Sequence, residues 1–379
     1  MPVKAIDVLD IIKSEFGVVE EPKKPAPKPA PKKLETVKTS SLATTKDFSS
    51  TLVEPFEEGF MDGYELKTPT GGKITLNHIW DAYKGGENIL LVGPSGSGKS
   101  TIAFHLLDRA NEDIRLKNVE IKEKNETLKE EEKHPYYKLP YEISHFSCHE
   151  ATRSESLIGS LTIKVNKDGS REPIIVHGAV LEAWTKGKTL ILEEMDFAPA
   201  GVWGETHQFF DGRTKETTVY INGPERVRKH PNFRVIATAN TLGSGENQIE
   251  YSGTQILNRA FMNRFTYIVH VSYMKSAYET KLIHEKTGLS MDTAEKMVAA
   301  AKRTREAHDE GIIDCAITTR DILSWAKECL REEKRRRSSS VTGVAYWQEV
   351  AIPSASPAFL NRIADKTVLD TMASYLRLR

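Results

Sequence analysis

The sequence predicts an α/β protein, with a parallel-sheet core that carries two β-hairpin inserts and is followed by a small, all-helical lid domain. Three observations predict this fold class. Short apolar runs alternate with helical patterns from about residue 54 onward, as in a parallel sheet. Two strand–turn–strand patterns interrupt the alternation. Beyond residue 273 the pattern is wholly helical. We therefore expect an α/β core at 51–273, the lid at 274–335 and a C-terminal tail at 336–379.

The residues before the core are predicted to form no domain of their own. Apolar residues recur near helical spacing within residues 1–18, which indicates a short amphipathic helix. Residues 19–50 are rich in Pro, Lys, Ser and Thr, a composition that cannot bury a core and is typical of a disordered linker. A helix on such a tether is either a docking peptide for a partner or a frayed end.

The core strands are predicted from apolar runs, the lid helices from apolar positions at helical spacing, and the hairpins from Asp-Gly and Asn-Gly turns. A charged insertion, Lys117–His134, is expected to be a solvated helix or loop, and the basic run from Lys334 to Ser340 a solvated loop. The expected strands are Asn88–Val92, Tyr141–Cys148, Thr189–Leu192, Phe233–Thr238 and Tyr267–Val271, the hairpins are Thr162–Val165 with Pro173–Val176 and Thr217–Ile221 with its Asn222–Gly223 turn, and the helices are Ala277–Lys286, Met291–His308 and Thr319–Leu330.

Composition narrows the class of protein. Lys and Arg together number 53, as do Asp and Glu, so no net charge draws the whole molecule to nucleic acid or to an anionic membrane. No uninterrupted apolar run has transmembrane length. The three cysteines stand at no metal-ligand or CxxC spacing and are expected to be free thiols. We therefore expect a cytoplasmic protein without a membrane partner.

The strongest chemical signal follows the first expected strand. The motif GxxxxGK[ST] is met between that strand and a helix, which is the context that a phosphate-binding loop requires. Its glycines let backbone N–H groups converge on phosphate at a helix N-terminus, Lys99 neutralises the β and γ oxygens, and the Ser100 hydroxyl is a ligand of Mg²⁺. This pattern predicts a site for ATP and Mg²⁺ formed by Gly93, Pro94, Ser95, Gly96, Ser97, Gly98, Lys99, Ser100 and Thr101.

A second apolar strand ends in two acids, Glu193 and Glu194, as a Walker B element does. The first acid is expected to hold the Mg²⁺ shell, and the second to orient the attacking water as a general base. An acidic helix start is the alternative. Glu193 is one methylene longer than the usual Asp, so its metal-bound water is expected at a shifted position.

Three further polar residues stand at positions from which they could reach the phosphates. Asn240 ends the strand expected between the two Walker strands, where its amide can bond the water or the γ-phosphate. Arg264 precedes the last core strand, where a guanidinium can reach a neighbouring subunit's γ-phosphate. Arg320 begins a lid helix and can close onto the phosphates. A surface arginine and a salt bridge are the respective alternatives for Arg264 and Arg320.

Taken in this order, these elements resemble the dynein-related branch of AAA+ ATPases, which includes MoxR-type proteins, over roughly residues 54–330. The run ATANTLGSGENQIEYSGTQILNRAFMNRF, with KHPNF before it, is similar to the ATPase subunit of cobaltochelatase and its CobS-like relatives. The resemblance implies that Asn240 is sensor 1, Arg264 the arginine finger and Arg320 sensor 2. It also implies that the two hairpins face the pore or partner surface of a ring.

The sequence departs from that family pattern in three places. Glu193 replaces the usual Asp, Asn263 stands where Asp commonly precedes the finger arginine, and the N-terminal helix with its tether lies outside the pattern. Because of the N-terminal helix and its tether, the family pattern does not identify the partner of this protein.

Three classes of function remain open. The first is an ATP-hydrolysing motor that forms a ring, expected to be a hexamer, and remodels a protein client. A narrower version is the ATPase subunit of a cobalt or magnesium chelatase, acting with a von Willebrand A-type partner subunit. The second class is a nucleotide-switched binding module with little hydrolysis. The third is a nucleic-acid translocase, for which Arg226, Arg228 and Lys229 form a basic cluster, although the neutral total charge does not favour it.

Overall fold

The computed structural model describes residues 63–137, 142–242, 253–336 and 343–377. The expected N-terminal helix and linker, and the start of the core at residues 51–62, lie outside the described residues. The chain divides into two units, residues 1–46 and 47–379, and all that follows concerns the second. No described helix is long and apolar enough to cross a membrane.

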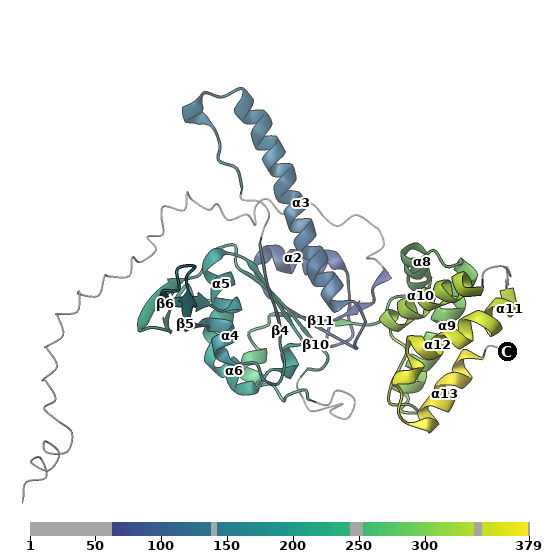
Figure 1. The fold of residues 1–379 in the computed structure, drawn as a ribbon. Coiled ribbons are helices and arrows are strands. Elements are labelled where there is room, and N and C mark those ends of the chain that lie inside the picture. Colours follow the sequence, from purple (N-terminus) through teal and green to yellow (C-terminus); the bar gives the residue numbers. More distant parts are fainter. Residues whose placement is uncertain (1–62, 138–141, 243–252, 337–342, 378–379) are drawn as a thin grey trace, which may run out of the picture. The chain divides into compact units, whose positions relative to one another are not determined.

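The centre of the fold is a seven-stranded sheet with the order β2-β1-β11-β3-β10-β7-β4 (Figure 1). The five strands from β11 to β4 are parallel, and β1 and β2 add an antiparallel edge. The α/β fold class is therefore confirmed, whereas the two edge strands were not predicted, since each has only two residues. The strands are β1 (Leu66–Lys67), β2 (Lys73–Ile74), β3 (Asn88–Val92), β4 (Ile143–Ser147), β7 (Thr189–Glu193), β10 (Arg234–Ala239) and β11 (Tyr267–Val271).

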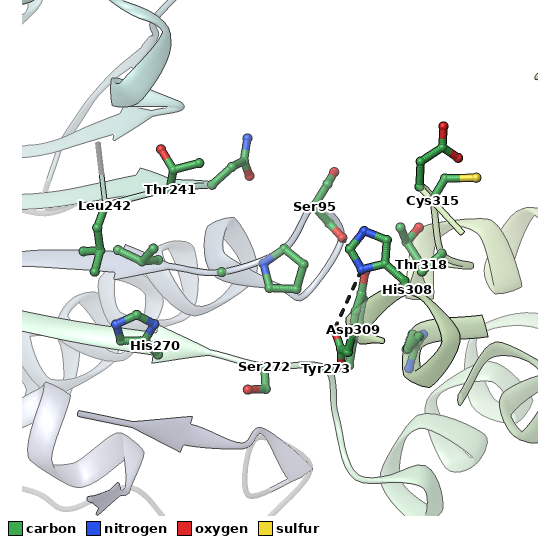
Figure 2. Close-up of a pocket in the computed structure, with 17 residues that line it drawn as sticks. Ser95, Thr241, Leu242, His270, Ser272, Tyr273, His308, Asp309, Cys315 and Thr318 are labelled. Carbon is green, nitrogen blue, oxygen red and sulfur yellow. Dashed lines mark hydrogen bonds and ion pairs between the residues drawn. The ribbon is translucent and has the colours of Figure 1, made fainter. Parts of the chain in front are cut away.

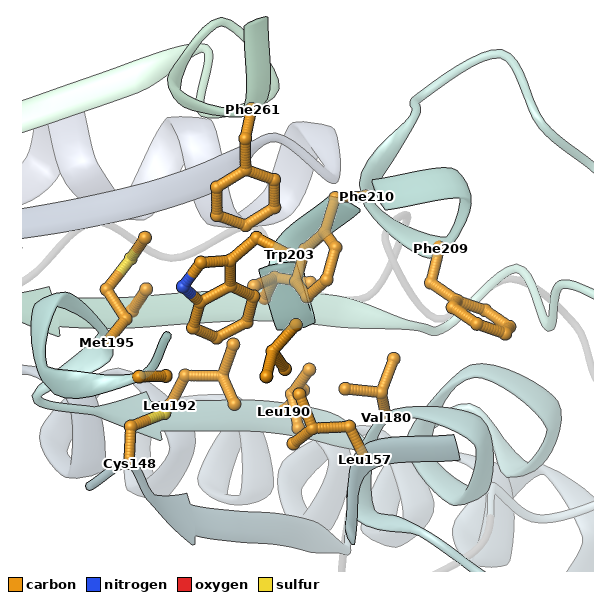
Figure 3. Close-up of a cluster of buried hydrophobic side chains, with 14 of the residues drawn as sticks. Cys148, Leu157, Val180, Leu190, Leu192, Met195, Trp203, Phe209, Phe210 and Phe261 are labelled. Carbon is orange, nitrogen blue, oxygen red and sulfur yellow. The ribbon is translucent and has the colours of Figure 1, made fainter. Parts of the chain in front are cut away.

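Two apolar clusters cover the two faces of the sheet. The central strands are continuous hydrophobic runs because parallel strands are buried on both faces. On one face, Trp203 stacks on Phe261 with ring centroids 4.9 Å apart, within an aromatic group that also holds Phe210 (Figure 3). On the other face, helices α2 and α3 bury their apolar sides. The core helices are α2 (Leu76–Gly85), α3 (Lys99–Glu126), α4 (Ser154–Ile158), α5 (Ala179–Lys186), α6 (Ala200–Thr206) and α7 (Arg259–Met262).

The first half of the charged insertion is helical and continues the helix after the phosphate loop. Helix α3 runs 28 residues, and a short 3₁₀ turn, η3 (Glu130–Glu132), follows it (Figure 1). Asn118 and Asn125 lie two turns apart on α3, and each side-chain amide donates to and accepts from one backbone residue of the returning chain, Tyr137 and His134 respectively. These paired bonds hold the extended return segment along the helix.

Both predicted hairpins are present. Strand β5 (Gly159–Val165) pairs antiparallel with β6 (Arg171–His177), and β8 (Glu216–Tyr220) pairs with β9 (Pro224–Arg228). The turn between β5 and β6 has Gly169 at φ 81°, a conformation that glycine adopts without steric cost.

The C-terminal region is helical, as predicted, and it includes the tail. Helices after residue 342 contribute Tyr346, Trp347 and Leu376 to the same buried cluster as α9 and α10, so the tail completes the lid core. The basic run was predicted as a loop, and this is wrong for its first part: α10 continues to Arg336, whose guanidinium bonds Glu332 one turn earlier. The elements are α8 (Ser276–Thr287), α9 (Met291–Asp309), α10 (Thr319–Arg336), α11 (Gly343–Tyr346), the π-helix η6 (Trp347–Ala351), α12 (Ile352–Ala358), η7 (Leu360–Arg362) and α13 (Lys366–Leu376).

Replacing Trp347 with Ala is expected to destabilise the lid by about 3–5 kcal/mol. Its indole packs 5.4 Å from that of Trp325 and donates a hydrogen bond to the Leu376 carbonyl, so truncation leaves both a cavity and an unpaired acceptor. Chemical denaturation followed by tryptophan fluorescence measures the loss. Val344→Ala, at a side chain 69% exposed, is the control and should leave the midpoint unchanged. Equal midpoints for Trp347→Ala and wild type would contradict the assignment of the tail to the lid core.

Candidate nucleotide-binding site

The loop between β3 and α3 has the backbone that a phosphate cradle requires. Gly96 and Gly98 adopt φ values of 72° and 98°, in the left-handed region. A Cβ on Gly96 would lie 2.8 Å from the Thr318 side chain, and one on Gly98 would lie 2.5 Å from the Tyr64 ring. Glycine is therefore needed at both positions. Helix α3 begins at Lys99, so its unpaired N–H groups and its dipole favour an anion in the loop.

The lysine of the loop points back into the cradle. The Lys99 Nζ donates to the carbonyls of Gly93 (2.6 Å) and Pro94 (2.9 Å) and to the Asn240 Oδ1 (3.0 Å). Burial lowers the pKa of Lys99 to about 8, against the opposing influence of the nearby carboxylates, Asp196 first among them. The charged ammonium is thus held where a phosphate would offer it stronger acceptors than these neutral oxygens.

Nucleotide affinity is expected to fall above pH 8. Below that pH Lys99 carries its proton in the free protein. Phosphate favours the charged form and raises the pKa, so above pH 8 binding must take up a proton. The association constant should then fall by up to about tenfold per pH unit. Titration of a fluorescent ADP between pH 7 and 9.5 measures this. Lys99→Arg keeps its charge and should show a shallower slope, and a flat wild-type profile would contradict the prediction.

Glu193 lies beside Ser100, as the Walker B reading requires. Burial alone would raise the pKa of Glu193, but hydrogen bonds from Ser100 and from His145, whose Nε2 is 2.8 Å away, outweigh it and hold the pKa below its usual value. A hydroxyl and an ionised carboxylate are hard oxygen donors, and Mg²⁺ keeps several waters and takes further ligands from phosphate. The two residues therefore fit Mg²⁺, which would supply positive charge to the phosphate oxygens.

Glu194 is held in a strained backbone conformation. Its φ of 54° and ψ of 44° place it in the left-handed region, and among the described residues it is the only non-glycine residue at positive φ. Its backbone N–H donates to the Thr238 hydroxyl of the neighbouring strand β10. Such strain costs about 1–3 kcal/mol and is found mainly at functional sites. Its carboxylate lies within electrostatic reach of Lys99.

Asn240 follows β10, which lies between β3 and β7 as predicted. Its backbone position depends on Asp196, a buried residue of the turn η4 (Met195–Phe197). The Asp196 Oδ2 accepts from the N–H groups of Asn240 (2.9 Å) and Thr241 (3.0 Å). Burial raises the pKa of Asp196 even though these bonds oppose it. Asp196 thereby ties the segment after the Walker B strand to the residue that contacts Lys99.

The two candidate arginines occupy different surroundings. Arg320 is exposed in the first turn of α10, and it lies close enough for its positive charge to lower the pKa of both Lys99 and Glu193. Arg264 follows α7, and its guanidinium lies 4.0 Å from the carboxylate of Asp211. Within the described part of the chain, Arg264 makes no hydrogen bond or ion pair with Lys99, Glu193 or Glu194. The structure thus brings Arg320 to the cradle of its own subunit and leaves Arg264 apart from it.

A pocket of about 570 Å³ opens beside the phosphate loop (Figure 2). Pro94, Ser95 and Asn240 line it from the core, and Arg305 and Thr318 line it from the lid. Tyr273, on the segment that joins β11 to α8, lines it as well. The pocket therefore adjoins the predicted phosphate site at the junction of core and lid.

Comparison with known families agrees with this geometry. Residues 136–257 match the AAA domain of the dynein-related subfamily. Residues 279–336 match the C-terminal region of the CbbQ/NirQ/NorQ proteins, and residues 70–170 match subunit ChlI of magnesium chelatase. Between residues 70 and 336 the chain is therefore similar to AAA+ ATPases of the MoxR type. The predicted resemblance to the dynein-related branch is confirmed, and the match to the CbbQ/NirQ/NorQ C-terminal region falls on the lid helices α8–α10.

The similar proteins reveal little about the activity of this chain. An uncharacterized protein of Staphylococcus saprophyticus is 29% identical over 206 residues, and one of Staphylococcus aureus strain USA300 is 30% identical over the same length. Each alignment covers 54% of this chain and 63% of the relative, so the chain spans less than two thirds of these proteins. Two mutants of RuvB from Thermotoga maritima are distant structural neighbours at 12% identity, with TM-scores of 0.43 and 0.41, over 74% and 72% of this chain and 66% and 65% of theirs.

Sequence reasoning located the AAA+ motifs but missed the residues that hold them in place. His145 and Asp196 belong to no motif: His145 reaches the site because β4 pairs with β7, and Asp196 because the turn η4 that follows β7 lies against the end of β10. Tyr273 and Arg305 lie in the pocket at its lid side. The available signal was the position of His145 within the expected strand Tyr141–Cys148, which the structure pairs with β7.

Proposed function

We propose that this chain is an ATP-driven AAA+ motor that assembles into a ring, binds ATP at subunit junctions and remodels a protein partner by hydrolysis. The observation that carries this proposal is the gathering of Lys99, Glu194, Asn240 and Arg320 around one cradle. Such a set can bind phosphate, orient water and neutralise the charge that develops in phosphoryl transfer.

Each side chain has a role that follows from its position. Lys99 and the α3 N-terminus bind the phosphates, and Ser100 with Glu193 holds Mg²⁺. Glu194 accepts a proton from the attacking water, which Asn240 orients. Arg320 closes from the lid onto the γ-phosphate. This assignment gives Glu193 a metal-binding role in place of Asp, with His145 keeping its carboxylate ionised and oriented.

Ring assembly is supported by the position of Arg264. An arginine that stabilises phosphoryl transfer must reach the γ-phosphate, yet Arg264 lies against Asp211 and away from the cradle of its own chain. The Nε of Arg264 is buried and makes no hydrogen bond within the described residues. The Arg264 side chain as a whole is 33% exposed, which leaves part of the guanidinium accessible to the γ-phosphate of a neighbouring subunit. We infer a homo-oligomer, with a hexamer as the expected form.

A protein client is supported by the hairpin β5–β6. Leu161, Ile163 and Val165 alternate along β5 and therefore share one face, on which Ile175 and Pro173 of β6 lie opposite the first two. The three β5 side chains are 48%, 66% and 62% exposed. An exposed apolar face on a two-stranded hairpin is typical of a surface that binds protein. Ile163→Asp should abolish any stimulation of ATP turnover by the client without altering basal turnover.

The second candidate is the ATPase subunit of a cobalt or magnesium chelatase with a von Willebrand A-type partner. The match of residues 70–170 to subunit ChlI favours it. Among the described residues no group of three His, Cys, Asp or Glu side chains is placed to hold a metal, so chelation chemistry would belong to the partners. A nucleic-acid translocase is less well supported, because Arg226 and Arg228 both pair with Glu216 across the β8–β9 hairpin.

Concentration-dependent hydrolysis tests the proposed function. Purified protein with Mg²⁺ and ATP should assemble into rings, measured by light scattering after size-exclusion chromatography, and its phosphate release per subunit should rise with protein concentration. Full specific activity in a dilute monomer would contradict the ring. Tight ATP binding without phosphate release would favour the nucleotide-switched module, and a salt-dependent DNA shift would favour the translocase.

A further inference from the structure

A tyrosine at the junction of core and lid contacts the backbone of the phosphate loop. Tyr273 lies between β11 and α8, and its hydroxyl donates to the Ser95 carbonyl at 3.1 Å. That carbonyl and the Gly96 N–H belong to one planar trans peptide, so they point in opposite directions. An acceptor that turns the Gly96 N–H therefore also turns the oxygen that Tyr273 holds. Figure 2 shows Ser95 and Tyr273 at the same pocket.

An arginine of the lid packs on that tyrosine. The Arg305 guanidinium lies 3.8 Å from the centroid of the Tyr273 ring, within the range of a cation–π contact. Its two terminal nitrogens bond the two carboxylate oxygens of Glu279, at 2.9 and 2.8 Å, and its Nε donates to the Ile317 carbonyl at 2.9 Å. The Glu279 side chain is fully buried and that of Arg305 is 11% exposed. Each of the three guanidinium nitrogens therefore donates one hydrogen bond, and these bonds fix the orientation of the planar group.

The same glutamate holds the start of the helix that carries Arg320. The Thr319 hydroxyl donates to the Glu279 Oε1 at 2.6 Å, and Thr319 is the first residue of α10. Thr318, one residue earlier, sits against Gly96 of the phosphate loop, where a Cβ would meet its side chain at 2.8 Å. The backbone on which Arg320 stands is therefore fixed by Glu279 on one side and by the loop on the other.

We propose that Tyr273, Arg305, Glu279 and Thr319 form a positioning relay that transmits the state of the phosphate loop to Arg320. Nucleotide phosphate on the Gly96 N–H fixes the Ser95 carbonyl, Tyr273 follows that carbonyl, and the Arg305–Glu279 pair carries the adjustment to the first turn of α10. In this relay the four residues act through Arg320. This relay rests on the proposed function, because it serves nucleotide binding at this site.

Two conservative variants test separate steps of the relay. Tyr273→Phe removes the hydroxyl and keeps the ring beneath Arg305. Thr319→Val removes the hydroxyl that donates a hydrogen bond to Glu279. Amide exchange of a peptide spanning residues 317–322 is measured with and without ADP. Wild type should show nucleotide-dependent protection, and both variants should lose it while remaining folded. ADP affinity should stay within about twofold while kcat falls by about fivefold, because the coupling and not the cradle is damaged.

Tyr375→Phe is the matched control, since it removes a hydroxyl from the lid helix α13 and should preserve the protection and kcat. Protection and kcat at wild-type levels in either Tyr273→Phe or Thr319→Val would overturn the relay, and so would equal losses in Tyr375→Phe. The wild type could also bind ADP without hydrolysing ATP. If both variants then lose the nucleotide-dependent protection, the relay is supported and the motor function is contradicted.

Discussion

Glu194→Gln should abolish steady-state ATP hydrolysis, by about 10²–10⁴-fold, while ATP binding remains nearly intact. The amide preserves the size and the strained backbone of Glu194 but cannot accept a proton from water. Lys99 and the α3 N-terminus, which carry the affinity for phosphate, are untouched. The variant should therefore hold ATP and accumulate as an assembled ring.

Phosphate release and equilibrium binding of a fluorescent ATP measure these two effects separately. Glu295→Gln, on the exposed side of α9, makes the same chemical change far from any motif and should leave both quantities unchanged. Turnover in Glu194→Gln within twofold of wild type would exclude Glu194 as the base. Loss of binding together with turnover would instead assign Glu194 a structural role.

Arg264→Ala should reduce turnover by about 10³–10⁵-fold and leave nucleotide binding intact, since an arginine finger acts only on the transition state. The position of Arg264 also predicts action between subunits, because Arg264 lies apart from the cradle of its own chain. At each junction the cradle of one subunit would use the Arg264 of its neighbour. Two inactive proteins should therefore complement each other.

Mixing Arg264→Ala with Glu194→Gln subunits tests this complementation. In a mixed ring, some junctions join the intact Glu194 of the first variant to the intact Arg264 of the second, and part of the turnover should return. Arg335→Ala, at an exposed arginine of α10, is the control and should be active alone. An absence of recovered activity in rings shown to be mixed would contradict action between subunits.

The motifs were predictable because each is encoded by neighbours in the sequence. The phosphate loop needs a strand, glycines at fixed offsets and a helix start, all within residues 88–101. The central strands were predictable for a similar reason, since burial on both faces demands continuous apolar runs. By contrast, strands β1 and β2 have two residues each and exist because the β11 edge offers them partners.

The tail and the groups that support the site could not be predicted in this way. Trp347 is buried in a cluster that includes Trp325 of α10, and no local pattern records that contact. His145 reaches Glu193 because β4 and β7 pair in a register that sets Ser147 opposite Glu193, 46 positions later in the sequence. Contacts of this kind depend on the completed sheet.

By itself, the sequence determined the α/β class, the glycine-rich loop before α3, the two acids at the end of β7 and the two hairpins, because short-range spacing specifies each of them. Only the tertiary structure decided which groups surround the cradle. It placed Asp196 on the backbone of Asn240, His145 on Glu193, and the pair Arg305–Glu279 between Tyr273 and the helix of Arg320. The physical reason is that hydrogen bonds and buried ion pairs act over about 3 Å, and folding alone brings together residues that lie far apart along the chain.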